Sequence, residues 1–88
     1  MTRYGRAFVI LAPYPAAVDY ARRLRRIPPG ARADLLRVLE SDSRVRADVI
    51  RQFHERPGGR EMAEVLIDLE EDELIRWQVI DLLHQLDC

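Results

Sequence analysis

The strongest constraint on the fold of this chain is an internal repeat. A shift of thirty residues aligns residues 33–54 with residues 63–84 without a gap, and nine of the 22 aligned pairs are identical. The identical pairs are Ala33/Ala63, Leu36/Leu66, Leu39/Leu69, Glu40/Glu70, Asp42/Asp72, Arg46/Arg76, Val49/Val79, Ile50/Ile80 and His54/His84. Both copies place apolar residues three and four positions apart, which is typical of amphipathic helices. The sequence therefore predicts a helical repeat fold with two helices in each unit.

A motif shared by the two copies narrows this prediction. Each copy reads Leu-x-x-Leu-x-x-Asp, then Val or Ile followed by Arg, and ends on Val-Ile; it spans residues 36–50 and again residues 66–80. The motif resembles the short, roughly thirty-residue HEAT-like repeats of phycobilisome-lyase-type proteins. The resemblance covers residues 31–86 and implies a right-handed stack of helical hairpins, although only two clear units are present.

The Asp and Arg residues of the motif have a structural interpretation. Asp42 and Asp72 stand where a helix N-cap is expected, because a carboxylate there accepts hydrogen bonds from free amide groups. Arg46 and Arg76 follow one turn later and can bridge these carboxylates. The resemblance implies that the four residues form a polar ladder between stacked repeats. The alternative is two surface ion pairs worth roughly 0.3 kcal/mol each, and neither interpretation makes these residues catalytic.

The remaining segments complete a single all-α domain of about five helices over residues 1–88. Apolar spacing predicts a capping helix at residues 14–27, the first repeat at residues 31–56 and the second at residues 60–86. Residues 1–12 form an arm that is either extended or a short helix. Two units are fewer than the three that a solenoid usually needs, so we expect both ends of the stack to be covered.

Different segments are expected to cover the two ends. The capping helix would pack on the first unit through Tyr14, Tyr20 and Leu24. The last helix has more apolar residues than one stripe requires, and a helix of this kind is often buried on two sides. The excess lies at Trp77, Leu82 and Leu86. We therefore expect either residues 1–12 or another chain to cover the last helix.

The composition excludes several classes of chemistry. All 14 basic residues are arginine, which removes Schiff-base lysines and the lysine of a phosphate-binding loop. The one cysteine, Cys88, excludes an intrachain disulfide and a multi-cysteine metal site. His54 and His84 lack a further ligand set, and the acidic turn at residues 70–73 lacks the glycine of a calcium loop. We therefore expect no catalytic, metal or cofactor site and no enzyme activity.

The location and source also follow from composition. The chain has no run of eighteen apolar residues, and the apolar run at residues 7–12 is too short for an export signal. We therefore expect a cytoplasmic protein with no membrane partner. A chain with arginine but no lysine and no asparagine is typical of a GC-rich bacterial genome, such as that of an actinobacterium or its phage.

Charge is distributed unevenly along the chain. Residues 1–60 carry 13 arginines and 6 acidic residues, whereas residues 61–88 carry 1 arginine and 9 acidic residues. Opposite charges at the two ends concern partners and assembly rather than fold, and they allow chains to associate head to tail. The candidate interaction residues are the arginines of the first helix and the apolar excess of the last, namely Arg22, Arg23, Arg25, Arg26 and Trp77.

These observations predict a non-catalytic protein–protein interaction or adaptor module that can self-associate. The alternative is a nucleic-acid-binding accessory protein that contacts phosphates through the arginine face of the first helix. The net charge of −1 weighs against this alternative, as does the scarcity of amide side chains suited to reading base edges.

Overall fold

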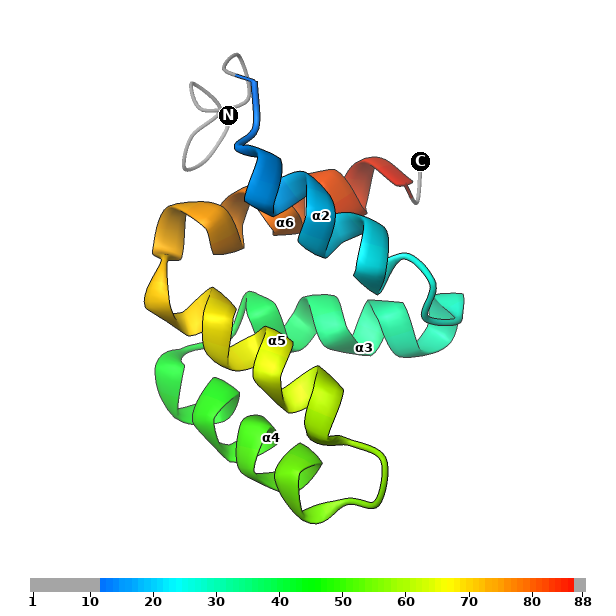
Figure 1. Ribbon diagram of the computed structural model, residues 1–88, viewed down its shortest axis with the longest axis vertical. Helices are drawn as coiled ribbons and strands as arrows, with labels where there is room; N and C mark the ends of the chain where they lie inside the picture. Colours follow the sequence, from blue (N-terminus) through cyan, green and yellow to red (C-terminus); the bar gives the residue numbers. More distant parts are fainter. Residues whose placement is uncertain (1–11, 87–88) are drawn as a thin grey trace.

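Proline, glycine and aspartate divide the chain into helices in the computed structural model, which describes residues 12–86 (Figure 1). The helices in this part of the chain are α2 (Pro15–Leu24), α3 (Pro29–Leu39), α4 (Ser43–Glu55), α5 (Arg60–Glu71) and α6 (Glu73–Leu86). The predicted all-α class is confirmed for these residues. The predicted arm lies outside the described residues except for Ala12, which belongs to no helix.

Local signals in the sequence explain where the helices begin. Pro15 and Pro29 stand in the first turns of α2 and α3, where a missing N–H group leaves no hydrogen bond unmade. Asp42 caps α4, because its carboxylate accepts from the N–H groups of Arg44 at 3.0 Å and Val45 at 3.1 Å. The Asp72 carboxylate accepts from the third amide of α6 at 3.2 Å. The expected N-caps are therefore present at both equivalent positions.

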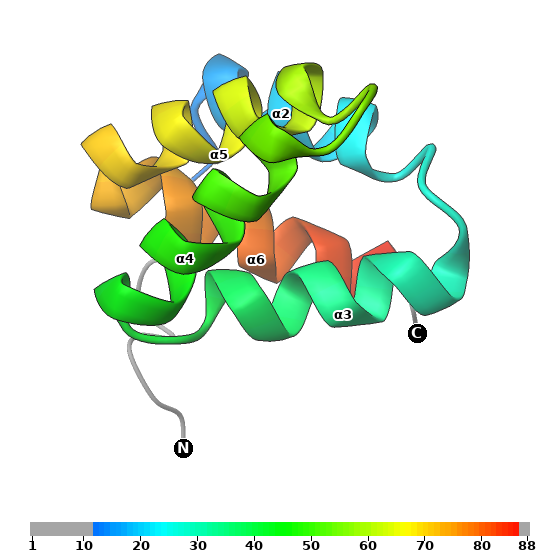
Figure 2. The same ribbon diagram turned by 90° about the horizontal axis from the view of Figure 1, so that it is seen from below.

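The helices enclose one apolar core. Its fully buried side chains come from α2, α3, α5 and α6, whereas α4 contributes none. The core consists of Ala17, Ala21, Leu24, Leu35, Leu36, Leu39, Val65, Leu66, Leu69, Ile75, Val79, Ile80 and Leu83. In Figure 2, α2 and α5 lie on one side of the molecule and α3 and α6 on the other. This arrangement leaves α4 at the edge of the domain.

The two repeat units contact each other through non-equivalent helices. The main contacts between the units join α4 to α5 and α3 to α6. The ribbons of α3 and α5 overlap in Figure 1, but Figure 2 shows that they lie apart. A solenoid would place equivalent helices side by side, so this pattern does not confirm the HEAT-like stack, which stays a prediction.

The capping helix covers a different unit from the one expected. We expected it on the first unit, but α2 packs on α6 in the second (Figure 1). The backbone N–H of Tyr14 donates to Gln78 Oε1 at 2.9 Å, and the Tyr20 hydroxyl donates to Asp68 at 2.9 Å. The apolar excess of α6 explains why α2 packs on the second unit, because α6 has the apolar Leu82 at the position where the first unit has Gln52. No helix within residues 12–86 is long and apolar enough to cross a membrane.

Candidate functional site

The exposed side of α4 is the first element of the site. Val45 is 42% exposed, whereas Ile75, its equivalent in the second unit, is 8% exposed. Val49 and Phe53 are half-buried, although their equivalents in α6 are completely buried. The two helices have nearly the same apolar pattern, but only α6 is covered by α2. The apolar stripe of α4 is therefore less buried than its equivalent on α6, with Val45 exposed and Val49 and Phe53 partly exposed.

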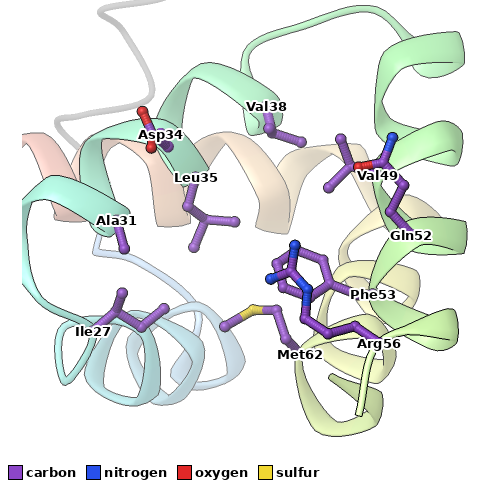
Figure 3. A pocket seen from close by; sticks show the side chains of 10 residues that line it. All are labelled: Ile27, Ala31, Asp34, Leu35, Val38, Val49, Gln52, Phe53, Arg56 and Met62. Atoms are coloured by element: carbon purple, nitrogen blue, oxygen red, sulfur yellow. The ribbon is translucent and has the colours of Figure 1, made fainter. Parts of the chain in front are cut away.

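Two residues of this stripe, Val49 and Phe53, form one wall of a groove together with Gln52 and Arg56. The groove has a volume of about 400 Å³, and α3 forms the opposite wall (Figure 3). Met62 of α5 and Ile27 after α2 lie at one side of it in Figure 3. The lining residues are Ile27, Ala31, Asp34, Leu35, Val38, Val49, Gln52, Phe53, Arg56 and Met62. Six of them are aliphatic, thioether or aromatic residues longer than alanine, so the groove suits apolar side chains of a ligand.

The groove is lined by one acidic and one basic side chain, Asp34 and Arg56. Asp34 lines the groove, but its carboxylate is bonded to Arg37 at 2.9 Å. Arg56 is exposed, and its guanidinium lies 4.8 Å from the centre of the Phe53 ring. Among the described ion pairs none includes Arg56. Arg56 is therefore a free cation at the edge of an apolar surface.

The repeat-ladder residues join the two units. Arg46 donates to Glu70 of α5 and to the carbonyl oxygen of Ser41. Arg76 is only 6% exposed and donates to the carbonyl oxygen of Leu39, the last residue of α3, at 2.6 Å. Burial, together with the nearby charge of Arg46, lowers the pKa of Arg76. The arginines thus bond to the other unit rather than to the aspartates that precede them, and their position is structural.

The predicted arginine face remains open to solvent. Arg22, Arg25 and Arg26 are exposed, and none of them is in an ion pair among residues 12–86. Arg22 and Arg25 also border a shallow pocket between α2 and α6. Arg23 lies over the ring of Tyr20, 5.6 Å from its centre. This surface therefore offers cations to an anionic partner.

Trp77 contributes less apolar surface than expected. It is half-buried and packs against the core, and the Arg76 guanidinium lies 5.2 Å from its ring centre. Leu82 of the same helix is half-buried beside α2. Trp77 and Leu82 of this apolar excess are thus partly used inside the domain, whereas the side chain of Leu86 lies outside the described part. The stripe on α4 is the more exposed apolar surface.

The titratable residues form no reactive or metal-binding cluster in the described part of the chain. His84 Nε2 lies 2.8 Å from the Glu40 carboxylate, which links α6 to the end of α3. Within residues 12–86, no group of three or more His, Cys, Asp or Glu side chains could hold a metal ion. The pKa of Tyr20 is raised by burial and by its hydrogen bond to Asp68. These contacts all connect helices and are explained by the fold.

The groove was not predicted from the sequence, although one signal pointed to it. Each unit has an apolar stripe, yet the chain has one capping helix for two units. The structure places that helix on the second unit, so α2 does not cover the α4 stripe. The sequence contains one difference between the stripes, Leu82 in the second unit and Gln52 in the first, but it did not show which segment would cover the last helix.

No family model, curated protein or solved structure matches this chain. The functional argument therefore depends on the groove and the charged surfaces themselves.

Proposed function

We propose that this chain is a non-catalytic protein-binding module, an adaptor, that binds its partner through the groove between α3 and α4. The observation that carries the proposal is the exposure of the α4 stripe, whose equivalent on α6 is buried beneath a helix. An apolar surface of this kind loses unfavourable contact with water when another protein covers it. The HEAT-like resemblance supports the same class of function. We include the HEAT-like fold and a cytoplasmic location in this proposal.

The composition of the groove supports a protein partner over a small substrate. Leu35 is buried and Phe53 is half-buried, whereas the polar lining residues Asp34, Gln52 and Arg56 are exposed. This layout matches the apolar centre and polar rim of protein interfaces. A catalytic site would need several convergent polar groups, whereas six of the ten residues that line the groove are apolar side chains longer than alanine.

A comparison of two surface variants tests the proposal. The groove variant combines Val45→Asp with Gln52→Asp, and the control is Ile67→Asp on the exposed side of α5. All three positions are exposed, so the fold should be retained in both variants. We expect partners captured by the unmodified chain to be retained by the control and lost by the groove variant. Equal capture by both variants would contradict the proposal.

The alternative function, nucleic-acid binding, is favoured by the open arginine face of α2. Arg22, Arg25 and Arg26 present three unpaired cations that could contact phosphates. A mobility-shift assay at rising salt tests it, because phosphate contacts must weaken steeply as salt increases. Binding that is lost in Arg22→Glu with Arg26→Glu, and retained in the groove variant, would favour this alternative.

A further inference from the structure

The position of α2 on α6 shows how this fold covers an apolar helix. The buried side chains of α2 are Ala17, Ala21 and Leu24, which are spaced four and three residues apart. Alanine at two of these positions allows the backbones of the two helices to approach closely. On the opposite side, α6 meets α2 near Gln78 and Leu82. The small-residue stripe of α2 therefore packs on an apolar stripe of α6, and we call this α6 surface the α2 seat.

The internal repeat identifies the positions of the first unit that are equivalent to this seat. A shift of thirty residues takes Ile75, Gln78 and Leu82, which lie near α2, to Val45, Asp48 and Gln52. These α4 residues are spaced three and four positions apart, so they share one helix face, and Arg56 follows at the C-cap of α4. The seat of α2 also borders α5 at Asp68, and the equivalent of Asp68 is Val38, which lines the groove. The groove thus shares Val38 and Gln52 with the counterpart of the α2 seat.

We propose that this groove binds an acidic amphipathic helix of a partner protein, placed against α4 as α2 is placed against α6. The inference rests on the proposed function and specifies the partner. By analogy with Ala17, Ala21 and Leu24, the bound helix presents two small residues and a leucine at positions i, i+4 and i+7. Helix-in-groove recognition of this kind depends on anchors at such spacings.

The charge that we expect on the partner follows from the charged residues at and near the groove. The segment from Arg22 to Arg60 contains eleven arginines and five acidic residues. Two of these acidic residues, Asp34 and Asp48, are paired with arginines of the same segment. The rim cation Arg56 has no such partner among the described ion pairs. Acidic side chains on the outer face of the bound helix would therefore complement the groove.

A second copy of the chain does not fit as the occupant. The exposed large apolar residues of the described part are Tyr14, Val45 and Ile67, which lie on three different segments. None of the described helices other than α4 thus has a free apolar stripe. Two α4 stripes facing each other would also bring the Arg56 residues of both copies together. A partner protein avoids both obstacles, because it supplies its own amphipathic helix and does not bring a second Arg56 to the groove.

Two synthetic peptides test the inference against the full chain. Each is a stapled helix of about 18 residues, long enough to be helical, with the Ala–Ala–Leu pattern of α2 on one face. One carries glutamate at the outward positions and the other carries arginine. We expect the glutamate peptide to bind about tenfold more tightly by fluorescence anisotropy at low salt, as two or three favourable charge contacts would give.

Variants locate the peptide. Arg56→Glu should weaken the glutamate peptide about tenfold and improve the arginine peptide. Arg44→Glu is the matched control, because it makes the same charge change on another face of α4 and should alter neither affinity. Gln52→Leu, which introduces the residue found in the second unit, should tighten both peptides. Gln52 and Arg56 are exposed, so circular dichroism should show an unchanged fold.

Several outcomes would overturn the inference. Equal affinity for the two peptides, or a preference for arginine, would contradict the assigned charge. Absence of binding would contradict the assigned binding site. Binding that responds to Arg22→Glu but not to Arg56→Glu would contradict it too. Occupation of the groove by residues 1–11 of the same chain, or by a second copy, would also contradict it. If neither peptide binds while partner capture still depends on Val45 and Gln52, the inference fails and the proposed function stands.

Discussion

At the scale of single residues, Arg76 is the clearest case of a polar group whose position is set by the whole fold. Its guanidinium is buried and donates to the carbonyl oxygen at the end of α3. Arg46, its equivalent, reaches Glu70 from a less buried position. The sequence predicted both arginines as structural but did not identify these partners, because each partner belongs to the other unit.

We predict that Arg76→Gln destabilises the protein by about 2 kcal/mol, because it removes a charge-assisted hydrogen bond and leaves the Leu39 carbonyl unpaired. The matched change Arg46→Gln should cost about 1 kcal/mol or less, since a partly exposed ion pair contributes little. Urea unfolding measures both values. A larger loss from Arg46→Gln would contradict the structural difference between the two arginines.

From the environment of Tyr20 we predict that the folded protein loses stability at alkaline pH. Burial and the hydrogen bond to Asp68 raise its pKa in the folded protein. Its contribution is therefore complete below the pKa of an unfolded tyrosine, about 10, and is lost as the pH rises through the folded value. We expect Tyr20→Phe to reduce the dependence of the unfolding free energy on pH above about 10. An identical dependence in both proteins would show that Tyr20 does not contribute.

At the scale of the helices, the sequence predicts most of what is observed. The two expected units, residues 31–56 and 60–86, agree within two residues with the spans of α3 to α4 and of α5 to α6. The capping helix is shorter than expected, since α2 ends at Leu24 rather than Ile27. Pro, Gly and Asp act on the neighbouring backbone, so their effects are visible in the sequence. The choice of packing partners depends on contacts distant in sequence, and the placement of α2 on α6 could not be predicted from local signals.

The turn between α4 and α5 gives a prediction at this scale. A Cβ atom at Gly59 would collide with the carbonyl oxygen of Phe53, whereas one at Gly30 would meet nothing within 4 Å. We expect Gly59→Ala to destabilise the protein by about 2 kcal/mol through this backbone clash. Gly30→Ala in the first turn of α3 should stabilise it by about 0.5 kcal/mol. Thermal unfolding compares the two, and equal effects would contradict the close approach at Gly59.

At the scale of the whole molecule, the basic and acidic parts of the chain give a prediction about assembly. Arg22 and Arg26 are exposed on the basic part, and α5 exposes Glu64 and Asp68 on the acidic part. We expect weak head-to-tail association at low salt that disappears at high salt, because screening shortens the range of these charges. Sedimentation velocity over a concentration series measures this association. Salt-sensitive association that persists in Arg22→Glu with Arg26→Glu would contradict it.

The groove is also a property of the whole molecule. The sequence predicted Arg22, Arg23, Arg25, Arg26 and Trp77 as the interaction surface, and this stays a prediction. The structure adds a difference between the units, because the apolar stripe on α4 is more exposed than its equivalent on α6. The difference arises because α2 can cover only one of two similar stripes. Which stripe stays open depends on the competition between the two units for α2, and Leu82 in α6 is more favourable for apolar packing than Gln52 in α4.

Amide chemical-shift mapping during titration with the glutamate peptide tests the central claim most directly. If the groove is a helix-binding site, the largest shifts will occur in α3 and α4, at Leu35, Val38, Val49 and Phe53. The amides of Arg22, Arg25 and Arg26 should move little. Shifts concentrated on these arginines, or none at saturating peptide, would contradict the claim that the groove between α3 and α4 is where this molecule binds its partner.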